Sequence, residues 1–585
     1  MKITRLLQMS PAEIATRAQQ AYSKRWSGAP VCRLIPSNAT PAFPDPPPYS
    51  LDQAAKICKH RFDLLGYKDL DFGTPIDWHL DPVHGKRAPR KPWYRIPFLD
   101  FDQIGDHKII WELNRHQHLV TLAQAGFCDE IRAQWTHWQS ENPYPIGINW
   151  ASTLEVAFRA LSWLWVRHFI GDFHDDLLPA LHLHGWYIER FLSTYYSPNT
   201  HLLGEGVALF AIGLLCPQIA DAPRWQSLGW SIVLKQAETQ VRPDGFHFEQ
   251  SVYYDIYALD FFRFARDLAA RNGLAIPPSF DGIIAKMTEA LAAISQAGRP
   301  PNFGDDDGGR VLGRRALARA GLQSGSVALP SAGIYTMTSA NSQFFIDAGP
   351  QGTFAAGHGH ADALSIQLVT AGRPVLIDPG TFCYVCPERD RFRGTAAHNT
   401  LQVDGRDQAQ PQGPFGWTAM PDTTVDSWQT RETFDFFAGH HDGYRPVIHH
   451  RWVFGLKSKF WLVRDLVTGP LRHQLDVNWH YLDERDIAVL PPAGHTWSRS
   501  IERWDWSPVY GQKEPAFVLR FRKETALPAE FAVLLVPGDA GTFTQTAPGA
   551  YRYDERDGSS HDFSFVGDHF VYRATGPAGA AEVTL

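Results

Sequence analysis

Hydrophobic residues recur at helical spacing through most of the first half of the chain. Between Ile109 and Ala297, apolar side chains lie three and four positions apart, which predicts amphipathic helices with one buried face. The segments with this pattern are 111–122, 154–170, 177–192, 202–215, 225–240, 254–270 and 283–295. Successive helices of similar length with short links favour helix pairs stacked around an axis, an α/α toroid. The periodicity alone leaves a helical solenoid as the alternative.

The pattern changes after residues 302–310. Short alternating or continuous apolar runs, separated by turn residues, replace the helical spacing, and such runs are typical of strands in antiparallel sheets. The runs are 343–347, 364–368, 451–454, 460–464, 516–521 and 531–536. The predicted fold class is therefore α+β and multidomain, with an N-terminal α/α toroid, or incomplete helical barrel, followed by a C-terminal antiparallel β-sandwich.

The length of 585 residues exceeds one ordinary hydrophobic core, so we expect more than one domain. Residues 1–50 are predicted to form a helix capped at Ser10 and then a Pro-rich extended lead-in. Residues 51–320 are assigned to the toroid as the catalytic domain, and residues 321–585 to the β-sandwich. We place the boundary between residues 315 and 330, where the helical pattern has ended.

Composition narrows the possible functions. A net charge of −7 provides no general basic field, which argues against binding of nucleic acid. An aromatic content of 13% slightly favours a carbohydrate enzyme, because flat rings stack on sugar faces. The six cysteines are scattered, and Cys383-Tyr-Val-Cys386 is interpreted as packing rather than as a metal or redox site.

No run of about 20 apolar residues is present, so no membrane span is expected. The first 26 residues lack the apolar segment of a signal peptide. We therefore expect a cytoplasmic protein, or a periplasmic or secreted one if the start of the chain has been trimmed.

Three imidazoles and two carboxylates gather in short segments of the second half. His358-Gly-His360-Ala-Asp362 is followed by Asp378, which ends an apolar run, and by His398, which precedes another. Two His and one Asp from neighbouring strands can hold a Zn²⁺ ion, and a third His then remains free for chemistry. Each histidine taken alone is more simply a hydrogen-bonded residue of a sheet, but the group together favours a functional site.

In the helical half, Asn199 is a candidate N-cap, and His201 and Glu205 lie four apart on one face of the helix that follows. A capped helix with a His–Glu pair and a functional site explain this pattern equally well. Tyr254 opens a later helix close to Glu249, a position where a phenol can face a cleft.

Further along the same helix, Tyr257 lies one turn beyond Tyr254 and is expected to be buried, and both Tyr253 and Tyr257 remain alternatives for the phenol role. Earlier in the chain, Asn149 and Trp150 lie at a helix mouth and could line a groove.

Taken together, these segments resemble the heparinase II/III-like polysaccharide lyases. Their order and spacing are more specific than any single motif. The matching segments are Asn149-Trp150, Asn199 to Glu205, Glu249 to Tyr254, His358 to Asp362, Asp378 to Gly380 and His398-Asn399. The resemblance implies an α/α toroid packed on an antiparallel β-sandwich, with the active site in the cleft between them. It also implies β-elimination, in which a base removes the C5 proton of a uronate, donors neutralise its carboxyl group and an acid protonates the leaving O4.

The resemblance assigns a role to each candidate catalytic residue. Asn199 and His201 would hold the uronate carboxyl group, and Glu205 would orient His201 or bond the carboxyl group itself. Tyr254 would protonate O4 and, in a syn elimination, also take the C5 proton. His358 would be the base for an anti elimination, or a second donor to the carboxyl group.

Substrate contacts and a metal are implied as well. The expected substrate-binding residues are Asn149, Trp150, Glu249, Tyr257 and Arg393. The expected ligands of a structural Zn²⁺ are His360, Asp378 and His398. The expected partner is an acidic polysaccharide or oligosaccharide, such as heparan sulfate, chondroitin, hyaluronan, alginate or a bacterial exopolysaccharide, and a homo-oligomer is possible.

Three other functions remain open. A glycoside hydrolase would need two carboxyl groups about 5 to 10 Å apart across a sugar. Asp305, Asp306, Asp307 and Glu249 are candidates for them, although the Asp triplet is more simply a polar turn. A non-catalytic glycan-binding protein would keep the aromatic groove, and a zinc hydrolase would use His360, Asp378 and His398.

Overall fold

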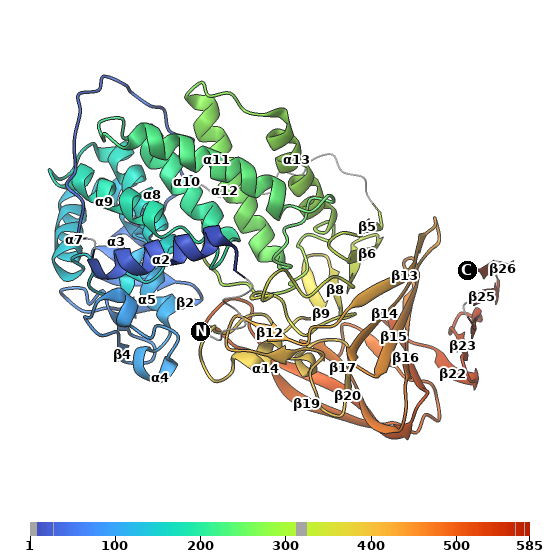
Figure 1. The fold of residues 1–585 in the computed structure, drawn as a ribbon. Coiled ribbons are helices and arrows are strands. Elements are labelled where there is room, and N and C mark those ends of the chain that lie inside the picture. The colour runs from blue at the N-terminus through green and yellow to red at the C-terminus, as the bar shows by residue number, and fades with distance from the viewer. Residues whose placement is uncertain (1–8, 27, 312–324, 568, 578) are drawn as a thin grey trace.

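The computed structural model describes residues 9–26, 28–311, 325–567, 569–577 and 579–585. Helices α2 to α13 lie on one side of the molecule and the large sheets on the other (Figure 1). The predicted fold class, a helical N-terminal part followed by an antiparallel β part, is confirmed. The predicted limit at residue 320 lies outside the described residues.

Most predicted helices are present within a few residues of their expected bounds. The helices of the first part are α2 (Pro11–Trp26), α3 (Leu51–Ile57), α4 (Phe101–Ile104), α5 (His107–Asn114), α6 (Gln117–Gln124), α7 (Cys128–Glu141), α8 (Thr153–Ile170), α9 (Leu177–Arg190), α10 (Thr200–Leu215), α11 (Ala222–Gln240), α12 (Val252–Arg271) and α13 (Pro278–Ala293). In the described residues, every helix is too short or too polar to cross a membrane.

Helix α10 forms the centre of this part, because it is buried on nearly all sides and packs against α8, α9, α11 and α12. Glycines allow its close contact with α11. A Cβ at Gly229 would lie 2.3 Å from the backbone nitrogen of Phe210, so only a residue without a side chain fits.

The helix predicted over 111–122 is wrong as a single element. The chain breaks between α5 and α6 at His116, whose φ of 59° is left-handed. Tertiary contacts stabilise the backbone where the helix is interrupted. Trp163 donates a hydrogen bond to His116 Nδ1 at 2.9 Å, and Ser162 donates one to the Arg115 carbonyl at 2.7 Å. Helix α7 was not predicted, because its surface is largely polar.

The described strands of the second part form three main sheets, all antiparallel. The nine-stranded sheet has the order β19-β20-β17-β9-β8-β7-β6-β5, with β10 also paired to β17. Its strands are β5 (Val327–Leu329), β6 (Ile334–Ser339), β7 (Ser342–Asp347), β8 (Ile366–Thr370), β9 (Arg373–Leu376), β10 (Leu401–Val403), β17 (Arg472–Tyr481), β19 (Ser498–Trp506) and β20 (Glu514–Ala526). The six-stranded sheet contains β13 (Thr423–Thr430), β14 (Phe434–Tyr444), β15 (Val447–Leu456), β16 (Phe460–Thr468), β21 (Ala529–Val536) and β18 (Ala488–Leu490), in that order. The five-stranded sheet contains β22 (Thr542–Ala547), β23 (Ala550–Asp554), β24 (Ser560–Val566), β25 (His569–Gly576) and β26 (Gly579–Thr584).

Three short pairs of strands lie outside the large sheets. Two are in the first part: β1 (Arg61–Leu64) with β2 (Tyr67–Asp71), and β3 (Leu80–Asp81) with β4 (Lys86–Arg87). The third, β11 (Gln410–Pro411) with β12 (Trp417–Thr418), is in the second part.

The six-stranded sheet is the middle layer of this part. Val453 on β15 belongs to the core shared with the nine-stranded sheet, and its neighbour Phe454 belongs to the core shared with the five-stranded sheet. Adjacent residues of a strand point to opposite faces, so a strand buried on both faces needs a continuous apolar run. The predicted sandwich is therefore extended by a third layer.

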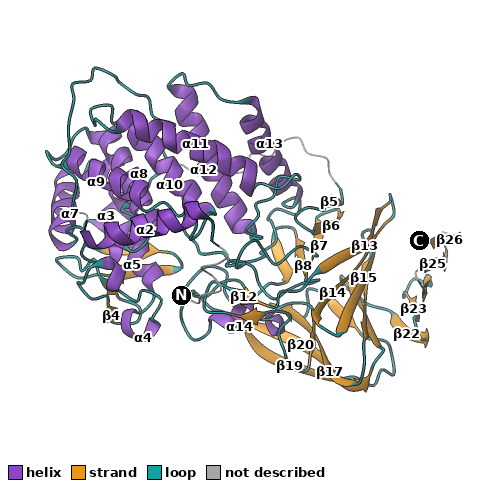
Figure 2. Cartoon of the chain, in the orientation of Figure 1, coloured by secondary structure: helices purple, strands orange, loops and turns teal. Residues whose placement is uncertain are grey.

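The long loop between β9 and β10 reaches from the nine-stranded sheet toward the helical part, and it contains the short helix α14 (Arg389–Arg393). Figure 2 shows α14 in purple beside the strands. This loop, the loop between β7 and β8, the segment 305–307 and the starts of α10 and α12 supply the candidate site.

Candidate active site

Tyr254 and His358, which come from the two parts of the chain, stack on each other. Their ring centroids lie 3.8 Å apart with an angle of 20° between the ring planes. Ser251 caps α12 by accepting a hydrogen bond from the Tyr254 backbone nitrogen at 3.1 Å, which fixes where this tyrosine leaves the helix. Only 5% of Tyr254 and 8% of His358 are exposed. Both side chains therefore face the same small site.

The Tyr254 hydroxyl contacts two further groups that were not predicted as part of the site. It donates to Asp307 Oδ2 at 3.2 Å and lies 2.9 Å from the Tyr384 hydroxyl. Because the Tyr254 proton is directed to Asp307, Tyr384 is the donor in the second bond. Burial, followed by the negative charge of Asp307, raises the pKa of Tyr254 well above its ordinary value. The phenol is therefore protonated at neutral pH.

Asp307 is held by cations. Lys108 Nζ lies 3.0 Å from Asp307 Oδ2 and 3.1 Å from Glu112 Oε2, and Arg115 bridges Glu112 and Glu155. Burial alone would raise the pKa of Asp307, but the charges of Lys108 and Arg115 outweigh it and lower this pKa below its ordinary value. Asp307 is thus a fixed acceptor for the Tyr254 hydroxyl.

Asp305 connects the His358 imidazole to the loop between β9 and β10. It is fully buried, and its two oxygens accept from Arg389 at 2.5 and 2.7 Å. The same carboxylate lies 3.1 Å from His358 Nδ1 and 3.0 Å from His360 Nε2. Burial opposes its ionisation, but Arg389 and the two histidines bring the pKa of Asp305 well below its ordinary value. An ionised Asp305 therefore fixes the orientation of both rings.

The prediction of a plain polar turn at 305–307 is wrong. Residues 305–307 form no turn: Asp305 and Asp307 contact His358 and Tyr254, whereas Asp306 lines a cavity on the other side. The signal in the sequence was the run of three consecutive aspartates between two glycines, because a short exposed turn does not need three carboxylates.

Asn199, Glu249 and His358 form a second network at the start of α10. Asn199 Nδ2 donates to Glu249 Oε1 at 2.6 Å, and the Thr200 backbone nitrogen donates to Glu249 Oε2 at 3.2 Å. His358 Nε2 lies 3.5 Å from Glu249 Oε1. Asn199 is also the predicted N-cap, because its Oδ1 accepts from the His201 backbone nitrogen at 3.1 Å.

The ionisable groups of this network have altered pKa values. Burial raises the pKa of Glu249. Burial and then the neighbouring His358 lower the pKa of His201 to about 4, so His201 is neutral at physiological pH. For His358 itself, burial acts to lower the pKa, but Asp305 and Glu249 together raise it above its ordinary value.

Glu205 does not make the predicted contact with His201. Its carboxyl group is fully buried and accepts from the Ser193 backbone nitrogen at 2.7 Å and the Ser193 hydroxyl at 2.6 Å. Burial raises the pKa of Glu205 to about 8. The i, i+4 spacing placed both residues on one side of α10, but a helix side chain can bond a neighbouring loop instead.

Asn149 and Trp150 do not line an open groove. They are 0% and 1% exposed, and both bond to residue Asn142: Asn149 Nδ2 to its side chain at 2.8 Å and Trp150 Nε1 to its carbonyl at 3.1 Å. Tyr257 is buried as expected and packs on the rings of Phe158 and Phe261.

The predicted substrate contact of Arg393 is wrong. Its side chain is fully buried, donates to the carbonyls of Gly413 and Pro414 at 2.6 and 3.1 Å, and lies over the Trp417 ring. Arg389, one helical turn earlier, is the arginine of this loop that reaches the site.

The predicted metal ligands lie together and are joined by a fourth residue. One donor atom from each of His360, Asp362, Asp378 and His398 lies within 4.8 Å of the others, and all four residues are buried. His360 Nδ1 and His398 Nε2 have no hydrogen-bond partner among the described residues. Two unpartnered imidazole nitrogens beside two carboxylates match the tetrahedral ligand set of Zn²⁺. Asp362 was quoted in the motif but not assigned as a ligand.

Cys383 and Cys386, interpreted from the sequence as packing, form a disulfide. Among the described residues, the other four cysteines are free. The disulfide closes a short loop around Tyr384, whose backbone nitrogen also donates to the Tyr510 hydroxyl at 2.9 Å.

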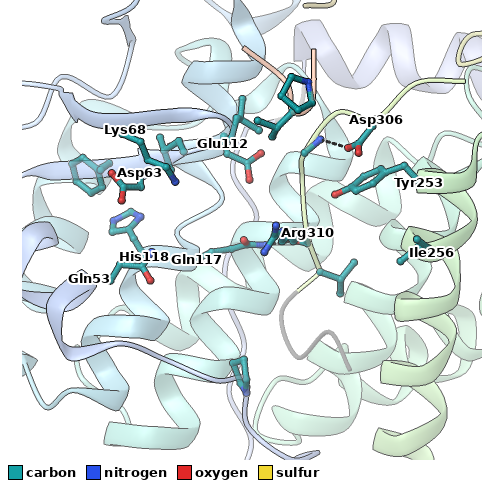
Figure 3. A pocket seen from close by; sticks show the side chains of 18 of the residues that line it. Gln53, Asp63, Lys68, Glu112, Gln117, His118, Tyr253, Ile256, Asp306 and Arg310 are labelled. Carbon is teal, nitrogen blue, oxygen red and sulfur yellow. Dashed lines mark hydrogen bonds between the residues drawn. The ribbon is translucent and has the colours of Figure 1, made fainter. Parts of the chain in front are cut away.

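A cavity of about 1110 Å³ lies next to the site but does not contain it. Val252, Tyr253 and Ile256 line the cavity from one face of α12, while Tyr254 leaves the opposite face. Figure 3 shows Tyr253 and Ile256 on one wall of this cavity and Asp63 and Lys68 on the other. The segment 305–308 separates the two spaces, because alternate residues face each side.

Comparisons with known proteins agree with this architecture. The chain matches the heparinase II/III N-terminus over residues 50–311 and the heparinase II/III-like C-terminal region over residues 322–539. A heparin-sulfate lyase of Pedobacter heparinus is 26% identical over 561 residues, covering 83% of this chain and 80% of the relative. A heparin-sulfate lyase of Bacteroides stercoris is 22% identical over 503 residues, covering 73% and 69%.

Solved structures share the fold. A crystal structure of heparinase III aligns with a TM-score of 0.70 at 15% identity and covers 98% of this chain and 95% of its own. That of a heparan sulfate lyase from Pedobacter heparinus aligns with a TM-score of 0.57 at 22% identity, covering 98% and 94%. The fold and the family matches are those of a polysaccharide lyase. The chain belongs to the heparinase II/III-like family.

Proposed function

We propose that this protein cleaves a uronate-containing polysaccharide, of the glycosaminoglycan class, by β-elimination. The observation that carries the proposal is the stacked pair of Tyr254 and His358, with Asn199 and His201 at its edge. The relatives named as heparin-sulfate lyases support the substrate class.

The first requirement is to neutralise the uronate carboxyl group, because the C5 proton becomes acidic only when the charge that develops on this group is stabilised. Asn199 and the neutral His201 are the half-buried donors at the start of α10. Glu249 accepts from Asn199 and from the Thr200 backbone nitrogen, and so holds the Asn199 side chain in place.

The second requirement is a base at C5. With the Nδ1 proton of His358 directed to Asp305, the Nε2 lone pair is available to take the C5 proton in an anti elimination. The pKa of His358, raised by Asp305 and Glu249 against the effect of burial, makes this imidazole a stronger base.

The third requirement is an acid at O4. As the C4–O4 bond breaks and the C4=C5 double bond forms, Tyr254 gives its proton to O4. Tyr384 already donates to the Tyr254 oxygen, so it stabilises the phenolate that remains. A syn elimination would need Tyr254 to start as a phenolate, which takes the C5 proton and then gives it to O4, and the raised pKa of Tyr254 disfavours that form.

We also propose that His360, Asp362, Asp378 and His398 hold a Zn²⁺ ion. When bound, the ion would supply a fixed positive charge and a cross-link between the loops that present His358 and Tyr384. Four protein ligands complete a tetrahedral shell, which favours a structural role over a zinc hydrolase.

The glycoside hydrolase alternative is less well supported. It needs a carboxylic acid that stays protonated to donate to the leaving oxygen. Two of its candidates, Asp305 and Asp307, are paired with cations and have lowered pKa values, which leaves Glu249, whose pKa burial raises, as the candidate acid.

The test is ultraviolet absorbance during incubation with a panel of uronate polymers, because elimination leaves an unsaturated uronate that absorbs and hydrolysis does not. We expect absorbance to rise with at least one glycosaminoglycan. Chain cleavage without absorbance would replace the proposal with hydrolysis, and binding without cleavage would replace it with a glycan-binding function.

A further inference from the structure

A second cluster of potential metal ligands lies on the six-stranded sheet. Asp426, His440 and His450 come from the three neighbouring strands β13, β14 and β15, and one donor atom from each lies within 4.8 Å of the others. The loops that carry the four-ligand cluster border the nine-stranded sheet, so this group is separate from it.

The strand register creates the cluster. His440 and His450 are paired directly across β14 and β15, and their ring centroids lie 5.3 Å apart. The pairing of β13 with β14 shifts between Val425 and Ser427, so Asp426 is the extra residue of a bulge. Bulges re-aim side chains, and this one brings Asp426 Oδ2 to 3.0 Å from His440 Nδ1.

The spacing suits a small cation. Two donor atoms on one tetrahedral Zn²⁺, with bonds near 2.0 to 2.1 Å, lie about 3.3 Å apart. The His440–Asp426 distance of 3.0 Å is already close to this value, and a rotation of the half-buried His450 side chain closes the remaining gap. Without a cation, two imidazoles directly opposite each other repel whenever both are protonated.

We propose that Asp426, His440 and His450 bind a divalent transition-metal ion, with Zn²⁺ as the best match to two imidazoles and one carboxylate. The side chains of His440 and Asp426 are 32% and 43% exposed, so the ion can enter from solvent and keeps an open coordination position for water. Because β13 is the edge strand of this sheet in the described residues, the ion would link β13 to its neighbour β14 and to β15, the next strand in. The site does not depend on the proposed lyase function.

The experiment is a calorimetric titration of the purified full-length protein with Zn²⁺. Besides the buried four-ligand cluster, we expect a second Zn²⁺ site, whose affinity falls at least tenfold in His450→Ala, in His440→Ala and in the shape-conserving Asp426→Asn. His473→Ala is the matched control, because His473 forms a similar exposed pair with Asp404, at 2.7 Å, with no second histidine assigned to that group. That variant should bind Zn²⁺ as the wild type does.

His398→Ala separates this site from the buried cluster. Loss of the titrated Zn²⁺ site in His398→Ala, with full binding in His450→Ala, would overturn the proposal, and so would equal affinity in all variants. A Co²⁺ titration gives a second readout, since a bound ion with imidazole ligands has visible absorption. The bands of this site should be absent from His450→Ala and those of the buried cluster absent from His398→Ala, and circular dichroism shows whether the sheets of each variant remain folded.

Discussion

The two walls of the candidate site are built differently. On the helical wall, Asn199 and Tyr254 are positioned by the caps at the starts of α10 and α12, which are local features of the chain. On the opposite wall, His358 and Arg389 come from long loops and are positioned by one buried carboxylate, Asp305. The helical wall therefore depends on separate local contacts, whereas the opposite wall depends on the single residue Asp305.

The largest effect is expected for Asp305→Ala. Removing this carboxylate leaves the buried Arg389 without its partner and frees both His358 and His360, so the free energy of unfolding should fall by about 3–5 kcal/mol. Activity should be lost with it. Chemical denaturation and the absorbance assay measure both effects. Asp306→Ala, on the cavity side of the same segment, is the control, and an equal loss in that variant would refute the central role of Asp305.

Tyr254→Phe should lower kcat by about 10²–10⁴-fold, because the proton donor to O4 is removed while the ring remains stacked on His358. Tyr253→Phe, which changes the neighbouring phenol on the cavity face, should keep nearly full activity. Steady-state kinetics on the best substrate compare the two. The opposite ranking would move the phenol role to Tyr253.

Tyr384→Phe should have a smaller effect, a fall in kcat of about tenfold, because it removes one hydrogen bond to the Tyr254 oxygen. The pH profile of kcat distinguishes this from a packing defect: its basic limb should move to higher pH, since loss of the donor makes the Tyr254 phenolate harder to form. An unchanged profile would contradict the role of Tyr384.

The smallest effect on activity is expected for Glu205→Gln on the helical wall. Glu205 has a pKa of about 8 in the folded protein, raised by burial, so the wild type loses stability as pH rises from the unfolded pKa, about 4.5, to 8. Glutamine keeps one acceptor oxygen for the Ser193 backbone nitrogen, and its NH2 group can donate to the Ser193 hydroxyl oxygen, without ionising. The variant should therefore gain stability relative to the wild type across this pH range, by up to ~4 kcal/mol at pH 8. Denaturation curves at several pH values measure the difference, and a constant difference would show that Glu205 does not titrate there.

The sequence contained enough local information to predict the helical wall. Asn199 and Tyr254 follow capping patterns that depend on a few neighbouring residues, and the change from helical to alternating spacing predicted the order of the two parts. The closely spaced histidines also predicted the cluster that Asp362 completes.

The remainder depends on contacts between distant segments. Asp307 meets Tyr254 across 53 positions and Tyr384 meets it across 130, so no local pattern records either pair. Spacing also misassigned Glu205 and Arg393, because position on a helix does not determine which neighbour a side chain bonds.

The central claim is that one sugar contacts both walls. The most direct measurement is a crystal structure of the His358→Gln variant with a bound uronate oligosaccharide. The account predicts the glycosidic O4 within about 3.2 Å of the Tyr254 oxygen, and the uronate carboxyl group bonded to Asn199 and His201. A sugar bound only in the cavity beside Tyr253, with no atom near Tyr254, would contradict it.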